Sequence, residues 1–209
     1  MNLILASSSL RRSEILRNAG IPFEVSAIPV DESRHSRESH ADYVKRLALA
    51  KARAAADAQR NRREEIWVVG ADTIILIGGE ILCKPVSADD ARRMLRRLSG
   101  TWHEVHTGLA LLRLPGAEST QATDGNRRVV EEITRVQLAP LSESELDAYI
   151  ATGDWSDKAG SYAIQGVGGR FVTRIEGCYF NVVGLPLARL WFLLKEFGWE
   201  RPASQVPDA

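Results

Sequence analysis

Three serines and two arginines stand close together near the start of the chain, within the segment Ser7-Ser8-Ser9-Leu10-Arg11-Arg12. The apolar residues before this segment predict a buried strand, and a helix is predicted to begin near Ser9. A helix N-terminus has free N–H groups and partial positive charge, so acidic residues are common there. Arginines in the first turn instead suit a bound anion. The alternative is that Ser9 only caps the helix and that the arginines face solvent on a surface turn.

A lysine interrupts an apolar stripe on the next predicted helix. Lys51 lies seven residues after Val44, on the face that Val44, Leu47 and Ala48 present to the core, because positions i, i+3, i+4 and i+7 share one side of a helix. Such a lysine either extends its ammonium group past the core into solvent or reaches into a cleft. The spacing leaves both interpretations open.

A carboxylate follows the predicted buried strand 66–69, in the segment Gly70-Ala71-Asp72-Thr73. In α/β enzymes the carboxyl end of a strand often carries a catalytic or metal-binding residue. Asp72 could also bond to its own backbone in a turn, although its apolar neighbours make that alternative less attractive.

Lys84, before Pro85 at a predicted strand end, could point at a phosphate. Gln165, in a glycine-containing segment, has the donor and acceptor needed to contact a base edge.

The elements that must position these residues alternate along the chain. Helices are predicted at 10–19, 39–59, 87–98, 142–153 and 186–197, and the second, third and fourth begin with a serine followed three residues later by an acidic residue, which is typical of helix N-termini. Strands are predicted at 3–6, 66–69, 103–114, 129–138 and 171–175, with a hairpin over 74–82. Hairpins and crossovers together predict an α/β (mixed α+β) fold with a mixed sheet.

The composition excludes several classes of protein. Of 209 residues, 44% are hydrophobic and 26% charged, which is typical of a soluble globular chain. Lys plus Arg and Asp plus Glu both number 27, so no basic surplus indicates nucleic-acid binding. Two cysteines give neither a disulfide framework nor a zinc site, and no apolar run could span a membrane. We therefore expect a cytoplasmic protein with one domain over 1–200, surface loops near 59–65 and 115–128, and a flexible C-terminal tail over 201–209.

In this order and spacing, the segments resemble the Maf family of nucleoside triphosphate pyrophosphatases, from Leu3 to about Leu194. The matching segments are 5–12, 70–73, 84–85, 98–100, 157–160, 164–166 and 181–186. The resemblance implies a two-lobed Maf/ITPase-like fold with a mixed twisted sheet and a central cleft. It also implies cleavage of a nucleoside triphosphate to the monophosphate and pyrophosphate with a divalent metal cation, Mg²⁺ or Mn²⁺. A homodimer is a further expectation from the family.

The resemblance also assigns roles to residues. Asp72 matches the family's proton acceptor. Arg12, Thr73 and Gln165 match the three positions that separate the subgroups, and their combination resembles the subgroup that hydrolyses dTTP and UTP rather than the one that acts on 7-methyl-GTP. The other polar cleft positions of the family are matched by Glu32, Lys51 and Lys84.

Residue chemistry and resemblance lead to one hypothesis. Phosphate oxygens are contacted by Ser7, Ser9, Arg11, Arg12, Lys51 and Lys84. Asp72 and Glu32 hold the metal, Asp72 activates the attacking water, and Gln165 contacts the pyrimidine. The alternatives are a nucleotide-sensing, non-catalytic regulator of cell division and a phosphatase that releases orthophosphate stepwise.

Three residues depart from the family pattern. Leu10 stands where proline is frequent, and Cys83 and Ala163 stand where glycine is usual. If the position of Cys83 requires a positive φ or a close approach of the backbone to phosphate, the cysteine is expected to strain the loop that carries Lys84. The same expectation holds in milder form for Ala163.

Overall fold

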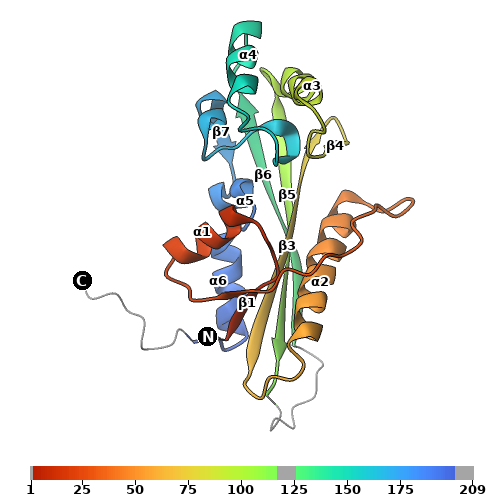
Figure 1. The fold of residues 1–209 in the computed structure, drawn as a ribbon, viewed down its shortest axis with the longest axis vertical. Helices are drawn as coiled ribbons and strands as arrows, with labels where there is room; N and C mark the ends of the chain where they lie inside the picture. Colours follow the sequence, from red (N-terminus) through yellow and green to blue (C-terminus); the bar gives the residue numbers. More distant parts are fainter. Residues whose placement is uncertain (1, 117–125, 201–209) are drawn as a thin grey trace, which may run out of the picture. The chain divides into compact units, whose positions relative to one another are not determined.

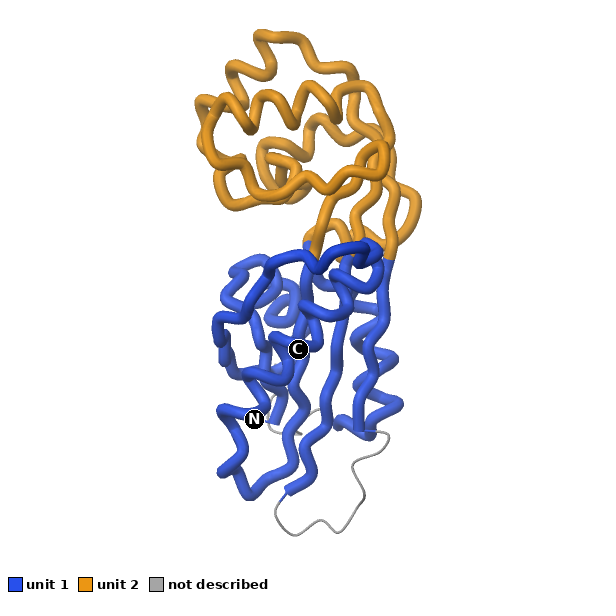
Figure 2. The backbone as a smooth tube through the Cα atoms, turned by 90° about the vertical axis from the view of Figure 1, so that its right-hand side faces the viewer, with its two compact units in different colours: residues 1–72, 107–132, 184–209 blue, residues 73–106, 133–183 orange. Residues whose placement is uncertain are grey.

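The computed structural model describes residues 2–116 and 126–200. The predicted tail 201–209 and most of the predicted loop 115–128 lie outside the described residues. The chain divides into two compact units, shown in Figure 2. Unit 1 consists of residues 1–72, 107–132 and 184–209, and unit 2 of residues 73–106 and 133–183. The chain therefore passes between the units four times, and the first passage falls between Asp72 and Thr73.

Seven strands within the described ranges form one mixed sheet (Figure 1). Its order is β2-β1-β3-β5-β6-β7, and β4 pairs with β3. The strands are β1 (Leu3–Leu5), β2 (Glu24–Val25), β3 (Ile66–Ile77), β4 (Glu80–Leu82), β5 (Trp102–Leu114), β6 (Arg127–Leu138) and β7 (Val172–Glu176). β1 pairs in parallel with β2 and β3, whereas β4 and β7 are antiparallel to β3 and β6. The predicted mixed sheet and the α/β class are confirmed.

The predicted helices begin close to the predicted positions, and serine side chains cap three of them. They are α1 (Leu10–Asn18), α2 (His40–Ala58), α3 (Ala88–Leu98), α4 (Glu143–Ala151), α5 (Tyr179–Val183) and α6 (Leu187–Glu196). The side chains of Ser39, Ser87 and Ser142 each accept a hydrogen bond from the backbone N–H three residues on, which satisfies a donor that the helix leaves unpaired. α5 and β2 were not predicted, since such short elements carry no periodic pattern.

β3 corrects one prediction about Asp72. One strand was predicted to end at residue 69 and another to begin at 74, but β3 is continuous over twelve residues. Asp72 consequently lies inside the strand rather than after its end. The small residues that suggested a strand end have a different purpose: a Cβ atom on Gly70 would lie 2.2 Å from the carbonyl oxygen of Ala48 and 2.8 Å from the backbone nitrogen of Ala52. Glycine is there because the backbone of α2 approaches β3 closely.

The core of unit 1 lies where α2 packs on the sheet. The buried residues Ala48, Ala52 and Ala55 of α2 belong to one apolar cluster with Ile4 and Val68 of the sheet. Alanines allow helix and sheet backbones to come close. Gly108 of β5 makes a second close approach to α2, since a Cβ atom there would lie 2.1 Å from the carbonyl oxygen of Val44.

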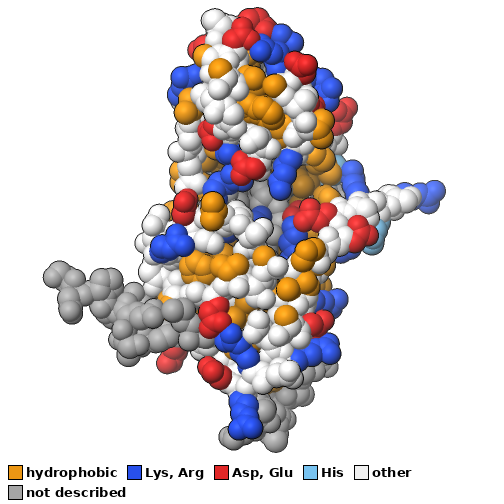
Figure 3. All heavy atoms as spheres, in the orientation of Figure 1, with side chains coloured by type: hydrophobic (Ala, Val, Ile, Leu, Met, Phe, Trp, Pro, Cys, Tyr) orange, Lys and Arg blue, Asp and Glu red, His pale blue; other side chains and the backbone are white. Residues whose placement is uncertain are grey.

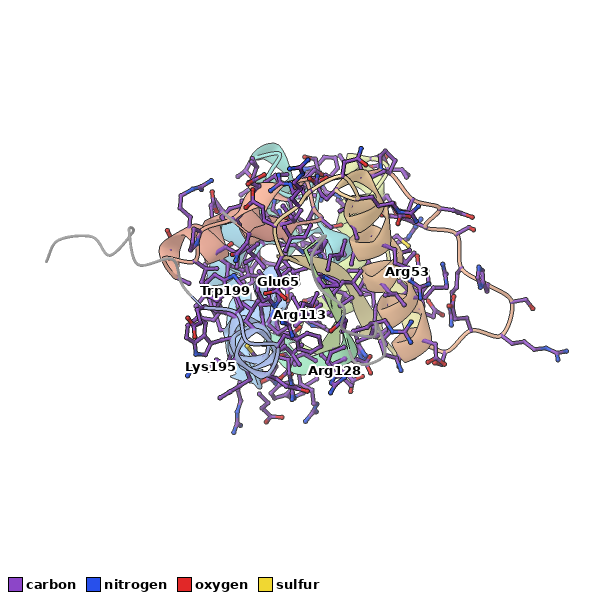
Figure 4. The ribbon with its side chains drawn as sticks, turned by 90° about the horizontal axis from the view of Figure 1, so that it is seen from below. Arg53, Glu65, Arg113, Arg128, Lys195 and Trp199 are labelled. Carbon is purple, nitrogen blue, oxygen red and sulfur yellow. The ribbon has the colours of Figure 1, made fainter. Side chains whose placement is uncertain are left out.

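Polar and aromatic contacts in unit 1 link β3, β5 and the end of α6. The guanidinium of Arg113 donates to the carboxylate of Glu65 at 2.6 Å and lies over the ring of Trp67, 5.8 Å from its centroid; Figure 4 labels Arg113 and Glu65 side by side. The indole N–H of Trp67 donates to the carbonyl oxygen of Phe197, just after α6. This last hydrogen bond attaches the end of α6 to β3.

Unit 2 has a core of its own. It contains Met94, Leu95 and Leu98 of α3 together with Tyr149 of α4 and Phe171 before β7. In this unit the ring of His103 meets the hydroxyl of Tyr162 at 2.8 Å. Burial lowers the pKa of His103 to about 4, so this histidine is uncharged at neutral pH.

Acidic and basic side chains share the face of the molecule drawn in Figure 3. On the face shown in Figure 3, acidic and basic side chains are interspersed rather than gathered by sign. This pattern matches the equal numbers of acidic and basic residues in the sequence.

Within the described ranges, none of the helices combines the length and the apolar character needed to cross a membrane.

We predict that Gly70→Ala lowers the free energy of unfolding by about 3 kcal/mol, because the added methyl group collides with backbone atoms that cannot rotate away. Urea denaturation monitored by circular dichroism measures the loss. Gly153→Ala is the control: it has open space around it but a φ of +70°, so only conformational strain of about 1 kcal/mol is expected. Equal losses in the two variants would contradict the close approach of α2 and β3.

Candidate active site

The side chains of Lys51 and Asp72 meet where α2 packs on β3. The ammonium nitrogen of Lys51 lies 2.6 Å from Oδ1 of Asp72 and 2.7 Å from Oε1 of Glu32. The side chains of Lys51 and Asp72 are only 16% and 12% exposed, whereas that of Glu32 is 59% exposed. Of the two interpretations of Lys51, the structure favours the one in which the side chain reaches into a polar site. The inward face of α2 therefore delivers a cation to two carboxylates.

Arg12 is fixed next to this group by the first turn of α1. Its Nε donates to the carbonyl oxygen of Gly184 at 2.7 Å, and its Nη1 donates to the hydroxyl of Ser7 at 3.0 Å. Ser7 follows β1 and is 7% exposed. Burial lowers the pKa of Arg12, and the negative charges of Asp72 and Glu32 act in the opposite direction. Arg12 thus lies near enough to Asp72 and Glu32, the carboxylates that Lys51 contacts, to feel their charge.

The start of α1 differs from the usual helix N-terminus in its cap and in its charge. Ser9 is the N-cap residue, yet its side chain makes no capping hydrogen bond within the described chain. The backbone N–H of Ser9 instead donates to the hydroxyl of Ser7. No acidic residue occupies the first turn, where Arg11 and Arg12 lie. The alternative in which the Ser9 side chain caps the helix is therefore not what the structure shows.

The four charged side chains at this site balance in sign. Arg12 and Lys51 are cationic, and Glu32 and Asp72 are anionic. Two carboxylates are fewer than a protein-only metal site needs, and no group of three His, Cys, Asp or Glu residues suited to a metal occurs among the described residues. Mg²⁺ commonly binds through one or two carboxylates and takes its remaining ligands from water and substrate phosphates. Glu32 and Asp72 fit that mode of binding, because both offer hard oxygen ligands at one place.

The remaining predicted residues belong to unit 2. Thr73 follows Asp72 in β3, Lys84 is exposed after β4, and Gln165 is exposed between the two 3₁₀ turns Ala159–Ser161 and Val167–Phe171. The segment that carries Gln165 rests on Asp154: a Cβ atom at Gly166 would lie 2.4 Å from its Oδ2. A side chain at position 166 would therefore have to displace the Asp154 carboxylate.

Cys83 and Ala163 do not strain their loops. Within the described ranges, the residues other than glycine with positive φ are Arg37 and Ser161. Cys83 therefore occupies an ordinary backbone conformation, and its carbonyl oxygen accepts a hydrogen bond from the N–H of Gly160 at 3.2 Å. Strain from a left-handed backbone, the first of the two reasons considered for glycine at this position, is therefore absent at Cys83.

Sequence reasoning missed residues that support the site. It assigned no role to Gly184, whose carbonyl oxygen orients Arg12, nor to Tyr43 and Arg46 of α2, which contact the segment that carries Glu32. One signal was present: Asn181 is a polar residue in an apolar motif. Asn181 is fully buried and donates to the carbonyl oxygen of Val105 and to the hydroxyl of Thr134, which fixes α5 just before Gly184.

Known proteins resemble this chain over nearly its whole length. A family model described as "Maf-like protein" matches residues 2–197. A protein of Hahella chejuensis named dTTP/UTP pyrophosphatase is 47% identical over 196 residues, which covers 94% of this chain and 92% of that protein. A protein of Anaeromyxobacter with the same name is 48% identical over 206 residues, covering 97% and 94%.

Solved structures give a weaker likeness. The Ham1 protein of Staphylococcus aureus aligns with a TM-score of 0.47 and 12% identity, covering 94% of this chain and 99% of that one. A likeness of this size assigns neither a substrate nor a residue role.

We predict that Lys51→Met lowers the free energy of unfolding by about 1–3 kcal/mol, because it leaves the carboxylate of Asp72 without its cation. The loss stays below that of a fully buried pair, since Glu32 is largely exposed. The double variant Lys51→Met/Asp72→Asn is expected to regain most of the lost stability. Lys45→Met is the matched control on α2: its exposed pair with Asp42 contributes about 0.5 kcal/mol or less. Equal losses at Lys45 and Lys51 in urea denaturation would refute the buried pair.

Proposed function

Because the chain belongs to the Maf family, we propose that it hydrolyses dTTP and UTP to the nucleoside monophosphate and pyrophosphate. The names of its relatives support this activity. The observation that carries the proposal is the group formed by Lys51, Asp72 and Glu32 with Arg12 beside it. In such a group the cations can bind phosphate oxygens, and the carboxylates can bind a metal and accept a proton.

Cationic and hydroxyl groups bind the triphosphate in this proposal. The substrate carries about four negative charges and needs several donors. Arg12 is already oriented by Ser7 and Gly184, so little conformational entropy is lost when it binds a phosphate oxygen. Further donors come from Ser7, Ser9, Arg11, Lys51 and Lys84.

Asp72 accepts the proton in the proposed reaction. Glu32 and Asp72 hold Mg²⁺ or Mn²⁺, and the bound cation supplies positive charge to the phosphate oxygens. A water oxygen forms a bond to the α-phosphorus while the bond from that phosphorus to the bridging oxygen breaks. The proton of the water passes to the carboxylate of Asp72. Pyrophosphate leaves, and Arg12 and Lys51 stabilise its charge.

Three residues decide the choice of base in this proposal. They are Arg12, Thr73 and Gln165, the positions at which the resemblance separates the family's subgroups. The side-chain amide of Gln165 can both donate to and accept from a pyrimidine edge.

We also propose action in the cytoplasm, in keeping with the free thiols of Cys83 and Cys178, and assembly as a homodimer.

We predict that Asp72→Asn lowers kcat for dTTP and UTP by about 10²–10⁴-fold, because the amide cannot accept the proton from water. The assay incubates the purified protein with each nucleotide and Mg²⁺ or Mn²⁺, and measures pyrophosphate and monophosphate in parallel. The variant is expected to keep its fold, since asparagine is isosteric with aspartate; circular dichroism checks this.

The same assay separates the proposal from its rivals. Orthophosphate released in steps would identify a phosphatase instead. Tight nucleotide binding without any product would identify a nucleotide sensor, an alternative that the names of the relatives do not favour. Full activity in Asp72→Asn would remove Asp72 as the proton acceptor while leaving the pyrophosphatase assignment in place.

We predict that Gln165→Glu changes the ratio of kcat/KM between dTTP or UTP and purine triphosphates by about tenfold or more, because a carboxylate cannot donate to the base. Thermal stability is expected to stay nearly constant, since Gln165 is exposed. Gln137→Glu, on β6 in the same unit, is the matched control and should leave the ratio unchanged. An unaltered ratio in Gln165→Glu would exclude its contact with the base.

A further inference from the structure

The segment that carries Glu32 has no regular structure of its own. Residues 31–38 form neither helix nor strand, and they connect the region after β2 to the start of α2. A residue on such a segment loses more conformational entropy when its side chain is held in one place. Even so, the Glu32 carboxylate lies 2.7 Å from the ammonium group of Lys51. Something other than local secondary structure must hold it there.

Two side chains of α2 bind the backbone of this segment. The hydroxyl of Tyr43 donates to the carbonyl oxygen of Glu32 itself, at 2.8 Å. The guanidinium of Arg46 donates to the carbonyl oxygen of Ser33 at 2.9 Å. Consecutive backbone carbonyls are therefore bound to one helix, which fixes the position from which the Glu32 side chain extends.

Arg46 also binds the other end of the segment. Its Nε and Nη2 donate to the two carboxylate oxygens of Glu38 at 2.6 and 2.9 Å, the two-pronged geometry that only a guanidinium provides. The hydrogen bond from Arg46 lowers the pKa of Glu38 to about 2, so the pair stays ionised near neutral pH. The side chain of Glu38 is only 8% exposed.

The segment is further closed on itself through Glu38. The backbone N–H of His35 donates to Oε2 of Glu38, and the guanidinium of Arg34 donates to the Glu38 carbonyl oxygen. Glu38 thus connects the turn to Arg46. One helix contacts residue 32 at both ends: Tyr43 at its backbone and Lys51 at its carboxylate.

We propose that Tyr43 and Arg46 are positioning residues, which hold the segment 31–38 on α2 so that the Glu32 carboxylate stays against Lys51 beside Asp72. The inference rests on the proposed function, because it assigns these two residues an effect on turnover through Glu32. In this proposal neither Tyr43 nor Arg46 contacts the substrate. Their effect should therefore depend on the presence of the Glu32 carboxylate.

The first experiment measures kcat and KM for dTTP and UTP in three variants. Arg46→Lys keeps the charge but loses the two-pronged contact, and we expect kcat to fall roughly tenfold, the size seen when an outer residue that orients a ligand is removed. Tyr43→Phe loses a single hydrogen bond, so a fall of roughly two- to fivefold is expected. Arg60→Lys is the matched control, since Arg60 lies just after α2 and its guanidinium pairs with the exposed Asp57; its kcat should not change.

A double-mutant cycle with Glu32→Gln then separates positioning from general stability. If Arg46 acts through Glu32, Arg46→Lys should change kcat less than about twofold in the Glu32→Gln background. The inference is overturned if the double variant shows the full product of the two single losses in kcat. It is also overturned if Arg46→Lys lowers kcat while Glu32→Gln does not. Tm values of all variants show whether a fall in kcat reflects unfolding, and Tyr43→Phe provides the test if Arg46→Lys folds poorly.

The wild-type protein distinguishes the two ways of failing. Absence of pyrophosphate release from any nucleoside triphosphate would refute the proposed function. Normal release by the wild type, with kcat unchanged in both Tyr43→Phe and Arg46→Lys, would refute the positioning role alone.

Discussion

The ion pair between Lys51 and Asp72 is the interaction on which the rest of the site depends. It joins a helix to a strand, and both side chains are largely withdrawn from water. Charges in such a place are tolerated only when they are paired and hydrogen-bonded. The pair can form because Gly70 lets the backbone of α2 approach β3 to a distance that a Cβ atom would prevent. A packing constraint between backbones therefore sets the position of the charged groups.

Rigid and irregular parts of the chain contribute differently to this site. Arg12 extends from the first turn of α1 and is bound by Ser7 and Gly184, and Lys51 and Asp72 extend from long regular elements. Glu32 alone comes from an irregular segment, and two side chains of α2 hold that segment in place. One helix thereby positions both the cation and the second carboxylate, which reduces the entropy lost when a ligand is bound.

Local patterns predicted most of the elements but not the course of β3. The serine caps at 39, 87 and 142 fixed three helix starts to within a residue, because capping depends on neighbouring residues only. Gly70-Ala71 was interpreted as a strand end, since small residues and a following carboxylate are typical of turns. Nothing within the strand itself indicates that Ala48 and Ala52, about twenty residues earlier in the sequence, bring α2 onto Gly70. The error therefore arose from a tertiary contact.

The sequence by itself determined the types of residue at the site, the stripe that turns Lys51 inward, and the family to which the chain belongs. These follow from helical periodicity and from motifs of a few residues, which are local properties of a chain. Only the tertiary structure decided that Lys51 binds two carboxylates, that the Gly184 carbonyl orients Arg12, and that Tyr43 and Arg46 hold the segment of Glu32. Each of these contacts joins residues whose separation along the chain, from 11 positions to 172, is bridged by packing, and packing depends on how whole elements meet.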